Sequence, residues 1–127
     1  MVVAISAGTT TVALPVELRR IADLTIVTNS IPVAEQFEPS RLDPRSSQTV
    51  LLTGGEPTLS SALVGPIAVS TVRGLHVDLL FLGVHGMHEK AGFTTPNLRE
   101  SEVDQALVEA AHRVVVLADH TKWGSSG

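Results

Sequence analysis

Five short runs rich in β-branched and other apolar residues constrain the fold of this chain more than any other feature. They span Val2–Ser6, Leu24–Thr28, Val50–Thr53, Val77–Leu82 and Val114–Ala118. Most are separated by segments long enough to return the chain across a sheet, several of them with apolar residues at helical spacing. Such alternation is typical of α/β proteins. We therefore expect an α/β fold of three layers, with a mostly parallel sheet flanked by helices.

The connecting segments predict four helices. The first includes Leu14, Leu18 and Ile21, and the second begins near Pro32 with Ala34 and Phe37 toward the core. The third and fourth are expected over residues 63–73 and 97–112, the fourth with Val103, Leu107 and residues 110–111 on its buried side. Residues 39–48 are charged and turn-rich, which favours an exposed connection.

Size and composition fit one globular domain. The chain has 127 residues, of which 43% are hydrophobic, and we expect a single unit over residues 1–124 with a flexible tail at 125–127. Its apolar stretches are too short to cross a bilayer, and its first residues lack the pattern of a signal peptide. The absence of cysteine excludes disulfides and thiolate chemistry. These features predict a soluble, cytoplasmic protein.

Charge and motifs exclude several functions. A net charge of −4 and few aromatic residues argue against nucleic-acid binding by this segment itself. His85, His88, His112 and His120 match no closed zinc site in a chain without cysteine, so we expect no metal. The sequence lacks a P-loop lysine, a three-glycine dinucleotide motif and a nucleophile elbow. We therefore expect neither ATP nor NAD, and no cofactor.

Small and polar residues follow almost every expected strand. They lie at residues 8–11, 28–30, 54–55, 83–86 and 119–122. The carboxyl ends of parallel strands share one sheet edge, which is where open α/β sheets bind ligands. There, Gly8, Thr9 and Thr10 could present backbone N–H groups and hydroxyls to a phosphate; the structural alternative is a simple turn and helix cap.

Three charged residues have two interpretations each. Lys122 could contact a phosphate or sugar oxygen, or it could be a solvated surface lysine. Asp78 interrupts an apolar strand and needs either a ligand or a structural partner. Glu100 begins a helix, where an acidic residue opposes the helix dipole, and it could also face a ligand.

Taken together, these segments carry a family resemblance. In order they are residues 8–10, 28–30, 54–55, 64–66, 78–83, 92–94, 100–103 and 119–124. Their order and spacing resemble the C-terminal sensor domain of DeoR-family transcription repressors, and the resemblance covers nearly the whole chain.

The resemblance implies a fold similar to ribose-5-phosphate isomerase and glucosamine-6-phosphate deaminase, with a phosphorylated sugar as effector. It also implies an N-terminal winged helix-turn-helix that reads operator DNA, expected in the full-length protein but absent from these residues, and assembly into homo-oligomers. Matching positions make residues 8–10 the phosphate site and place Asn29 and the 54–55 loop in the pocket lining. By the same comparison, the sugar is surrounded by Asp78, Gly83, Glu100 and Lys122.

Two departures from the family pattern concern the site. The family usually has Asp two positions before the first glycine, where this chain has Ser6. The isomerase-like enzymes carry a second carboxylate where this chain has Phe81, and losing a carboxylate removes a proton-transfer group. We therefore predict a non-enzymatic, effector-binding domain of a repressor of sugar metabolism. The alternatives are a sugar-phosphate isomerase-like enzyme and an oligomerisation or partner-binding domain with a vestigial pocket.

Overall fold

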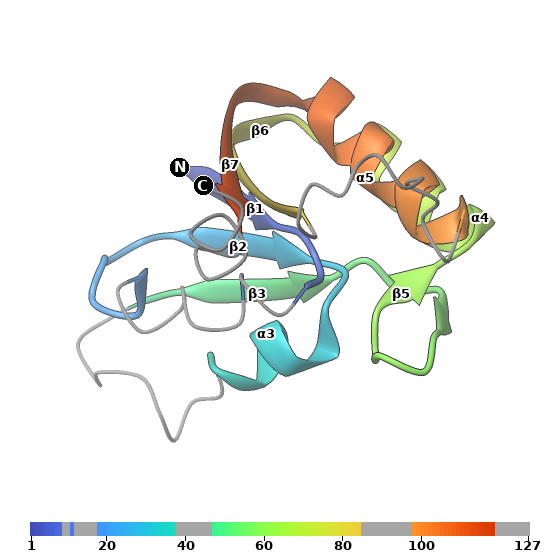
Figure 1. Cartoon of the computed structure of the whole chain (residues 1–127). Coiled ribbons are helices and arrows are strands. Elements are labelled where there is room, and N and C mark those ends of the chain that lie inside the picture. The colour runs from blue at the N-terminus through green and yellow to red at the C-terminus, as the bar shows by residue number, and fades with distance from the viewer. Residues whose placement is uncertain (9–10, 12–17, 38–46, 85–97, 119–127) are drawn as a thin grey trace, which may run out of the picture.

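A five-stranded, wholly parallel sheet forms the centre of the molecule (Figure 1). The computed structural model describes residues 1–8, 11, 18–37, 47–84 and 98–118. The strand order is β3 (Thr49–Leu52), β2 (Thr25–Thr28), β1 (Val2–Ile5), β6 (Val77–Val84) and β7 (Ala111–Ala118). All five expected strands are confirmed.

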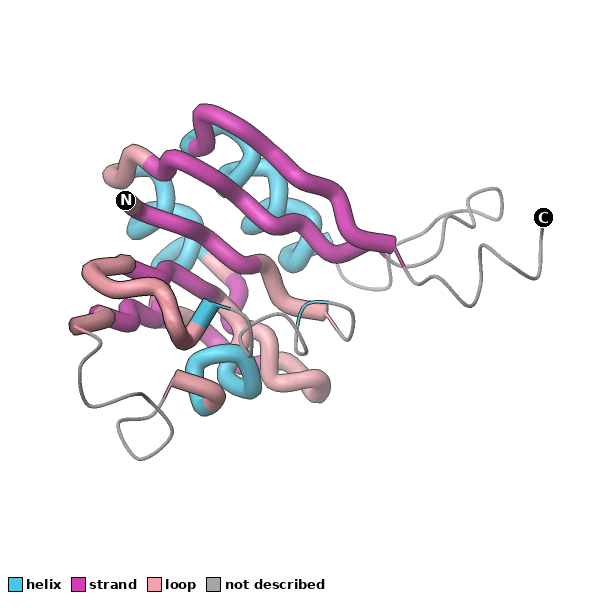
Figure 2. Tube along the Cα trace, turned by 90° about the vertical axis from the view of Figure 1, so that its left-hand side faces the viewer, coloured by secondary structure: helices cyan, strands magenta, loops and turns pink. Residues whose placement is uncertain are grey.

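Helices cover both faces of this sheet (Figures 1 and 2), so the predicted three-layer α/β architecture is confirmed. Helices α4 (Pro66–Arg73) and α5 (Leu98–Ala110) pack on one face, and α3 (Ile31–Glu35) packs on the other. Strand β1 divides its side chains between the two cores by alternation: Ala4 faces α4 and α5, whereas Val3 and Ile5 face α3. Because both faces are covered there, β1 is apolar at every position.

Helix α3 begins where Pro32 predicts it. Ser30 caps the helix, its hydroxyl accepting the Val33 N–H at 3.1 Å, and Pro32 occupies the first turn. Phe37 is buried as expected, but Ala34 is only half-buried. Val33 takes the central buried position instead.

The helix expected over residues 63–73 is shorter than predicted. Leu63–Val64 forms strand β5, which pairs antiparallel with β4 (Glu56–Pro57), and α4 begins only at Pro66. The reason is the Gly65-Pro66 pair: Gly65 takes a φ of +96°, and a proline disfavours helical backbone in the residue before it. The helical prediction for Leu63–Val64 was therefore wrong.

The last helix and strand meet without a connecting loop. Helix α5 ends at Ala110 and β7 begins at Ala111, three residues before the expected strand start at Val114. Pairing of Ala111 with Val77 draws this segment into the sheet. Val103 and Leu107 are buried as predicted.

Two sequence predictions fall largely outside the described residues, namely the helix around Leu14 and the exposed connection at 39–48. None of the helices in the described part of the chain is long and apolar enough to cross a membrane.

Candidate functional site

The carboxyl edge of the sheet gathers most of the sequence-predicted site residues that the structure describes. All five strands run in the same direction, so their carboxyl ends lie together at one edge of the sheet (Figure 2). The residues at this edge are Ser6, Gly8, Asn29, Gly54, Gly55 and Gly83. Thr9, Thr10 and Lys122 lie outside the described residues.

Ser6 joins the ends of β1 and β6. It is completely buried, its hydroxyl oxygen accepts the Gly83 N–H at 2.9 Å, and its own N–H donates to Phe81 O at 3.0 Å. Buried Thr11 supports the same turn, with its hydroxyl 2.7 Å from Ser6 O and 2.9 Å from Gly8 O. Sequence reasoning did not single out Thr11, although a threonine three residues after a glycine turn is a common local capping pattern. A neutral hydroxyl at position 6 thus fixes the turn that precedes Gly8.

Asn29 is a structural link between three segments. Its Oδ1 accepts the Ala7 N–H at 3.0 Å, its Nδ2 donates to Leu63 O at 3.1 Å, and Leu63 N–H donates to Asn29 O at 2.7 Å. The side chain is 1% exposed. Because both ends of the amide hold backbone groups, Asn29 positions the β1 turn against β5.

Gly54 and Gly55 form a turn that only glycine fits well. Their φ angles are +78° and +124°, and a Cβ at Gly55 would lie 2.5 Å from Val64 O. Among the hydrogen bonds of the described residues, none uses the backbone N–H of Gly54 or Gly55. Unused N–H groups in a glycine turn are suited to an anion.

Asp78 does not join this edge, which corrects the sequence prediction. It is the second residue of β6, at the amino end of the strand, and its side chain is exposed. Its Oδ2 accepts the Val2 N–H at 2.7 Å. The carboxylate therefore has the structural partner that was the alternative interpretation, and it ties the start of β6 to the start of β1.

Glu100 lies in the first turn of α5, as the helix-dipole argument predicts. Asp104 follows it one turn later and is half-buried. Burial, with a smaller contribution from the Glu100 carboxylate, raises the pKa of Asp104 to about 7. Sequence reasoning missed Asp104, whose only signal was its spacing of four residues from Glu100.

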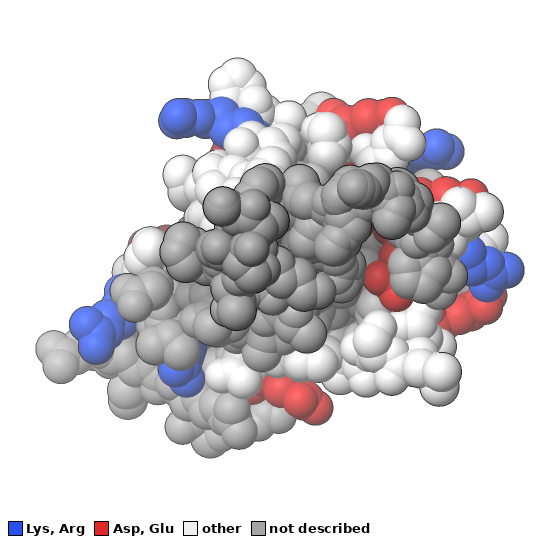
Figure 3. Space-filling view, viewed as in Figure 1, with Lys and Arg blue, Asp and Glu red and all other residues white. Residues whose placement is uncertain are grey.

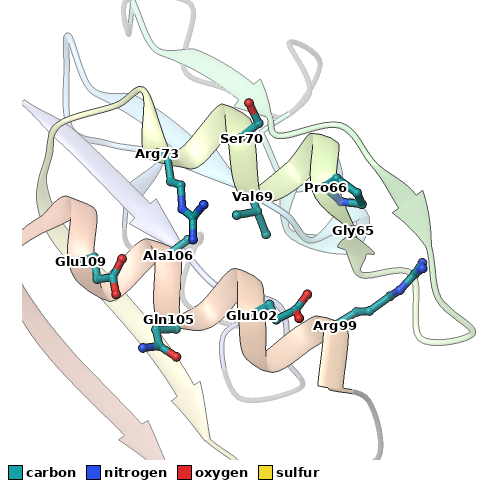
Figure 4. A pocket seen from close by; sticks show the side chains of 10 residues that line it. All are labelled: Gly65, Pro66, Val69, Ser70, Arg73, Arg99, Glu102, Gln105, Ala106 and Glu109. Carbon is teal, nitrogen blue, oxygen red and sulfur yellow. The ribbon is translucent and has the colours of Figure 1, made fainter.

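A separate groove lies between α4 and α5 (Figure 4). Its volume is about 740 Å³. Arg73 and Glu109 lie at one end, and Pro66 and Arg99 at the other, where Arg99 pairs with Glu56 at 2.6 Å. None of the sequence-predicted site residues lines it. The mixture of acidic and basic side chains makes this groove less suited to a phosphate than the glycine turn.

Charges of both signs are interspersed on the described surface. In the view of Figure 3, acidic and basic side chains alternate around α4 and α5, and the coloured atoms show no broad basic area. This face of the described residues lacks the continuous positive surface typical of DNA-binding proteins. The described residues also contain no group of three His, Asp or Glu side chains placed to hold a metal.

Comparisons with known proteins agree with this architecture. The family model of the DeoR C-terminal sensor domain matches residues 1–127. The HTH-type transcriptional regulator GlpR of Haloferax volcanii is 37% identical over 126 residues, which is 97% of this chain and 46% of that protein. The HTH-type transcriptional regulator GolR of Listeria innocua is 31% identical over 121 residues, 94% of this chain and 46% of that protein.

A third relative carries a repressor function in its name. The HTH-type transcriptional repressor GlcR of Bacillus subtilis is 31% identical over 124 residues, 98% of this chain and 46% of that protein. The chain thus spans about half the length of the curated relatives it matches. With a sensor-domain model matched from end to end and relatives that are transcription regulators, the chain belongs to the DeoR C-terminal sensor domain family.

Proposed function

We propose that this chain is the effector-binding domain of a DeoR-type repressor of sugar metabolism and that it binds a phosphorylated sugar at the carboxyl edge of its sheet. The observation that carries the proposal is the glycine turn at this edge. Gly54 and Gly55 leave backbone N–H groups unused at the same edge of the sheet as Gly8 and the Ser6–Gly83 link. These are neutral donors of the kind that bind phosphate oxygens.

The remaining ligand contacts come from residues that the sequence assigns. Thr9 and Thr10 would add hydroxyls to the phosphate site, and Lys122 a compact positive charge. Glu100, in the first turn of α5, would accept hydrogen bonds from sugar hydroxyls. Asp78 is not part of this site, because it lies at the amino end of β6.

The domain would regulate by differential affinity. An effector that binds one arrangement of the assembled protein better than another shifts the population toward it. An N-terminal winged helix-turn-helix in the full-length protein would convert this shift into a change in operator affinity. The relatives support this role, since their names describe HTH-type regulators and repressors.

One observation favours an isomerase-like enzyme as the second candidate. Asp104, with its pKa raised to about 7, and Glu100 could serve as an acid and base pair. This candidate predicts interconversion of an aldose and a ketose phosphate that Glu100→Gln abolishes. The sensor proposal predicts binding with no turnover.

The deciding experiment is a thermal-shift titration of this chain with pentose phosphates, hexose phosphates, the unphosphorylated sugars and inorganic phosphate. A ligand at about 100 times its Kd adds about 2.7 kcal/mol to the free energy of unfolding. We expect one sugar phosphate to stabilise the chain and its unphosphorylated sugar to have no effect.

Two lysine variants sharpen this test. Lys122→Ala should abolish the stabilisation, whereas Lys90→Ala, which removes the other lysine of the chain, should preserve it. A flat response to every sugar phosphate would overturn the proposal in favour of a partner-binding domain. An equal loss of this stabilisation in both variants would show that Lys122 is not part of the site.

A further inference from the structure

An ion pair joins the β4–β5 hairpin to helix α5. Arg99 Nη1 donates to Glu56 Oε1 at 2.6 Å, and the two residues are 43 positions apart in the sequence. Glu56 is the first residue of β4, and Arg99 is the second residue of α5. The pair therefore connects two elements that follow different strands of the central sheet, since β4 comes after β3 and α5 after β6.

Each partner is the immediate neighbour of a proposed ligand contact. Glu56 directly follows the Gly54–Gly55 turn, and Arg99 directly precedes Glu100. In the function proposed above, the turn binds the phosphate and Glu100 accepts hydrogen bonds from the sugar. The distance between these two contacts thus depends on how β4 is held relative to the first turn of α5.

Gly65 leaves room for the pair. A Cβ on Gly65 would lie 3.5 Å from Glu56 Oε2 and 3.9 Å from Arg99 Nη1, so both charged groups lie on the side of Gly65 where a side chain would project. Gly65 itself connects β5 to α4. The carboxylate and the guanidinium therefore meet at the one place where β4, β5, α4 and α5 come together.

The pair matters more for position than for stability. Its side chains are 53% and 63% exposed, and exposed ion pairs add little to the free energy of unfolding. The core already holds β5 against α5 through Val64 and Val103. Strand β4, by contrast, has only two residues, both exposed, and follows two glycines. Among the described residues, its one polar side-chain contact outside the hairpin is the bond to Arg99.

We propose that the Glu56–Arg99 ion pair is a positioning element that sets the spacing between the glycine turn and Glu100, and that this spacing selects among sugar phosphates. The inference rests on the function proposed above. A sugar phosphate contacts both places and is sensitive to the distance between them, whereas inorganic phosphate contacts only the turn. The pair therefore contributes to discrimination between effectors and not to phosphate binding itself.

Glu56→Gln tests the selection, because it removes one charge of the pair with little change in size. The probes are ribose 5-phosphate, glucose 6-phosphate and inorganic phosphate, measured by isothermal titration calorimetry. For the sugar phosphate that binds the unsubstituted chain more tightly, Kd should rise about fivefold, which is about the most that an exposed pair supplies. The Kd for inorganic phosphate should not change.

Two further variants serve as controls for this titration. The reversed pair, Glu56→Arg with Arg99→Glu, should restore most of the affinity for the sugar phosphate, because the two charges attract again. Glu102→Gln removes an exposed carboxylate elsewhere on α5 and should leave every Kd unchanged.

Distance measurements test the positioning without any ligand. The chain has no cysteine, so spin labels can be attached through Leu59→Cys at the exposed tip of the hairpin and Glu109→Cys on α5. Double electron–electron resonance should give a broader distance distribution after Glu56→Gln, and the original distribution with the reversed pair. A label pair at Thr49→Cys on β3 and Glu109→Cys should give the same distribution in all of these backgrounds.

The outcomes separate this inference from the function on which it rests. If the unsubstituted chain binds no sugar phosphate, the proposed function fails and this inference fails with it. If Glu56→Gln binds the sugar phosphate as tightly as the unsubstituted chain does, only this inference fails. An unchanged distance distribution, equal losses for sugar phosphate and inorganic phosphate, or no recovery in the reversed pair would also overturn it. A loss confined to the sugar phosphate, with a broader distribution and recovery of both in the reversed pair, supports it.

Discussion

Gly55 illustrates how the candidate site depends on the absence of a side chain. Its φ of +124° is unfavourable for other residues, and the position of a Cβ is taken by Val64 O at 2.5 Å and by the Ala68 side chain at 3.2 Å. The close approach lets the 54–55 turn pack directly on β5 and the start of α4. A glycine here is therefore required by packing, and the unused N–H groups of the turn are a consequence of that conformation.

Gly55→Ala should lower the free energy of unfolding by about 2 kcal/mol or more, because backbone strain and the clash with Val64 O add together. Urea denaturation would measure the change. The control is Gly74→Ala, where φ is −87° and the nearest atom to a Cβ is Thr71 O at 3.7 Å. We expect the control to change stability by less than ~0.5 kcal/mol. Equal effects of the two substitutions would contradict this account of Gly55.

At the scale of elements, a few buried polar side chains hold the carboxyl edge together. Ser6 links β1 to β6, and Asn29 links the β1 turn to β5. Hydrogen bonds to backbone groups fix the relative positions of strand ends in a way that apolar packing cannot. The site is therefore ordered by contacts between elements that are far apart in the sequence.

Asn29→Ala should lower the free energy of unfolding by about 2–4 kcal/mol, because it leaves the Ala7 N–H and Leu63 O without their partner in a buried place. It should also reduce the affinity for the effector, since the turn before Gly8 loses its anchor. Chemical denaturation and the ligand titration measure the two effects. The control, Ser60→Ala in the exposed β4–β5 hairpin, should change neither. If Asn29→Ala is as stable as the unsubstituted chain, Asn29 does not anchor the β1 turn to β5.

The strands could be predicted from the sequence because each is a local run of β-branched residues, and their parallel pairing follows from the helices between them. The convergence of Ser6, Gly8, Gly55 and Gly83 follows from the same topology. What failed depended on contacts that the apolar pattern does not contain. Leu63 pairs with Pro57 of β4, and its backbone is also held by Asn29, 34 residues earlier, whereas the pattern of residues 63–73 shows only helical spacing.

The prediction that Asp78 lies at the candidate site was wrong for a different reason. Its residue type suggested a functional carboxylate, and only the strand boundary shows that it lies at the amino end of β6. The polar link between Ser6 and Gly83 spans 77 residues and was equally invisible in the sequence. The sequence patterns thus predicted which edge of the sheet carries the candidate site. The role of each residue at this edge could be assigned only from the three-dimensional contacts.

For the whole molecule, the raised pKa of Asp104 makes stability depend on pH. The folded chain holds the proton up to a pKa of about 7, mainly because of burial and secondarily because of Glu100, whereas an unfolded aspartate releases it near pH 3.9. Between these values the folded state binds more protons than the unfolded state. The free energy of unfolding should therefore fall as pH rises from about 4 to 7.

Asp104→Asn tests this expectation, because asparagine resembles the neutral acid and cannot ionise. A shift of about three pKa units corresponds to up to about 4 kcal/mol, so the variant should be more stable than the unsubstituted chain at about pH 8 and gain little at about pH 4. Urea denaturation across this range measures the difference. Glu109→Gln, at an exposed position of the same helix, should give a profile parallel to that of the unsubstituted chain. If the profile of Asp104→Asn is also parallel to that of the unsubstituted chain, the Asp104 carboxylate is ionised in the folded chain over this whole pH range. A different group would then bind the proton.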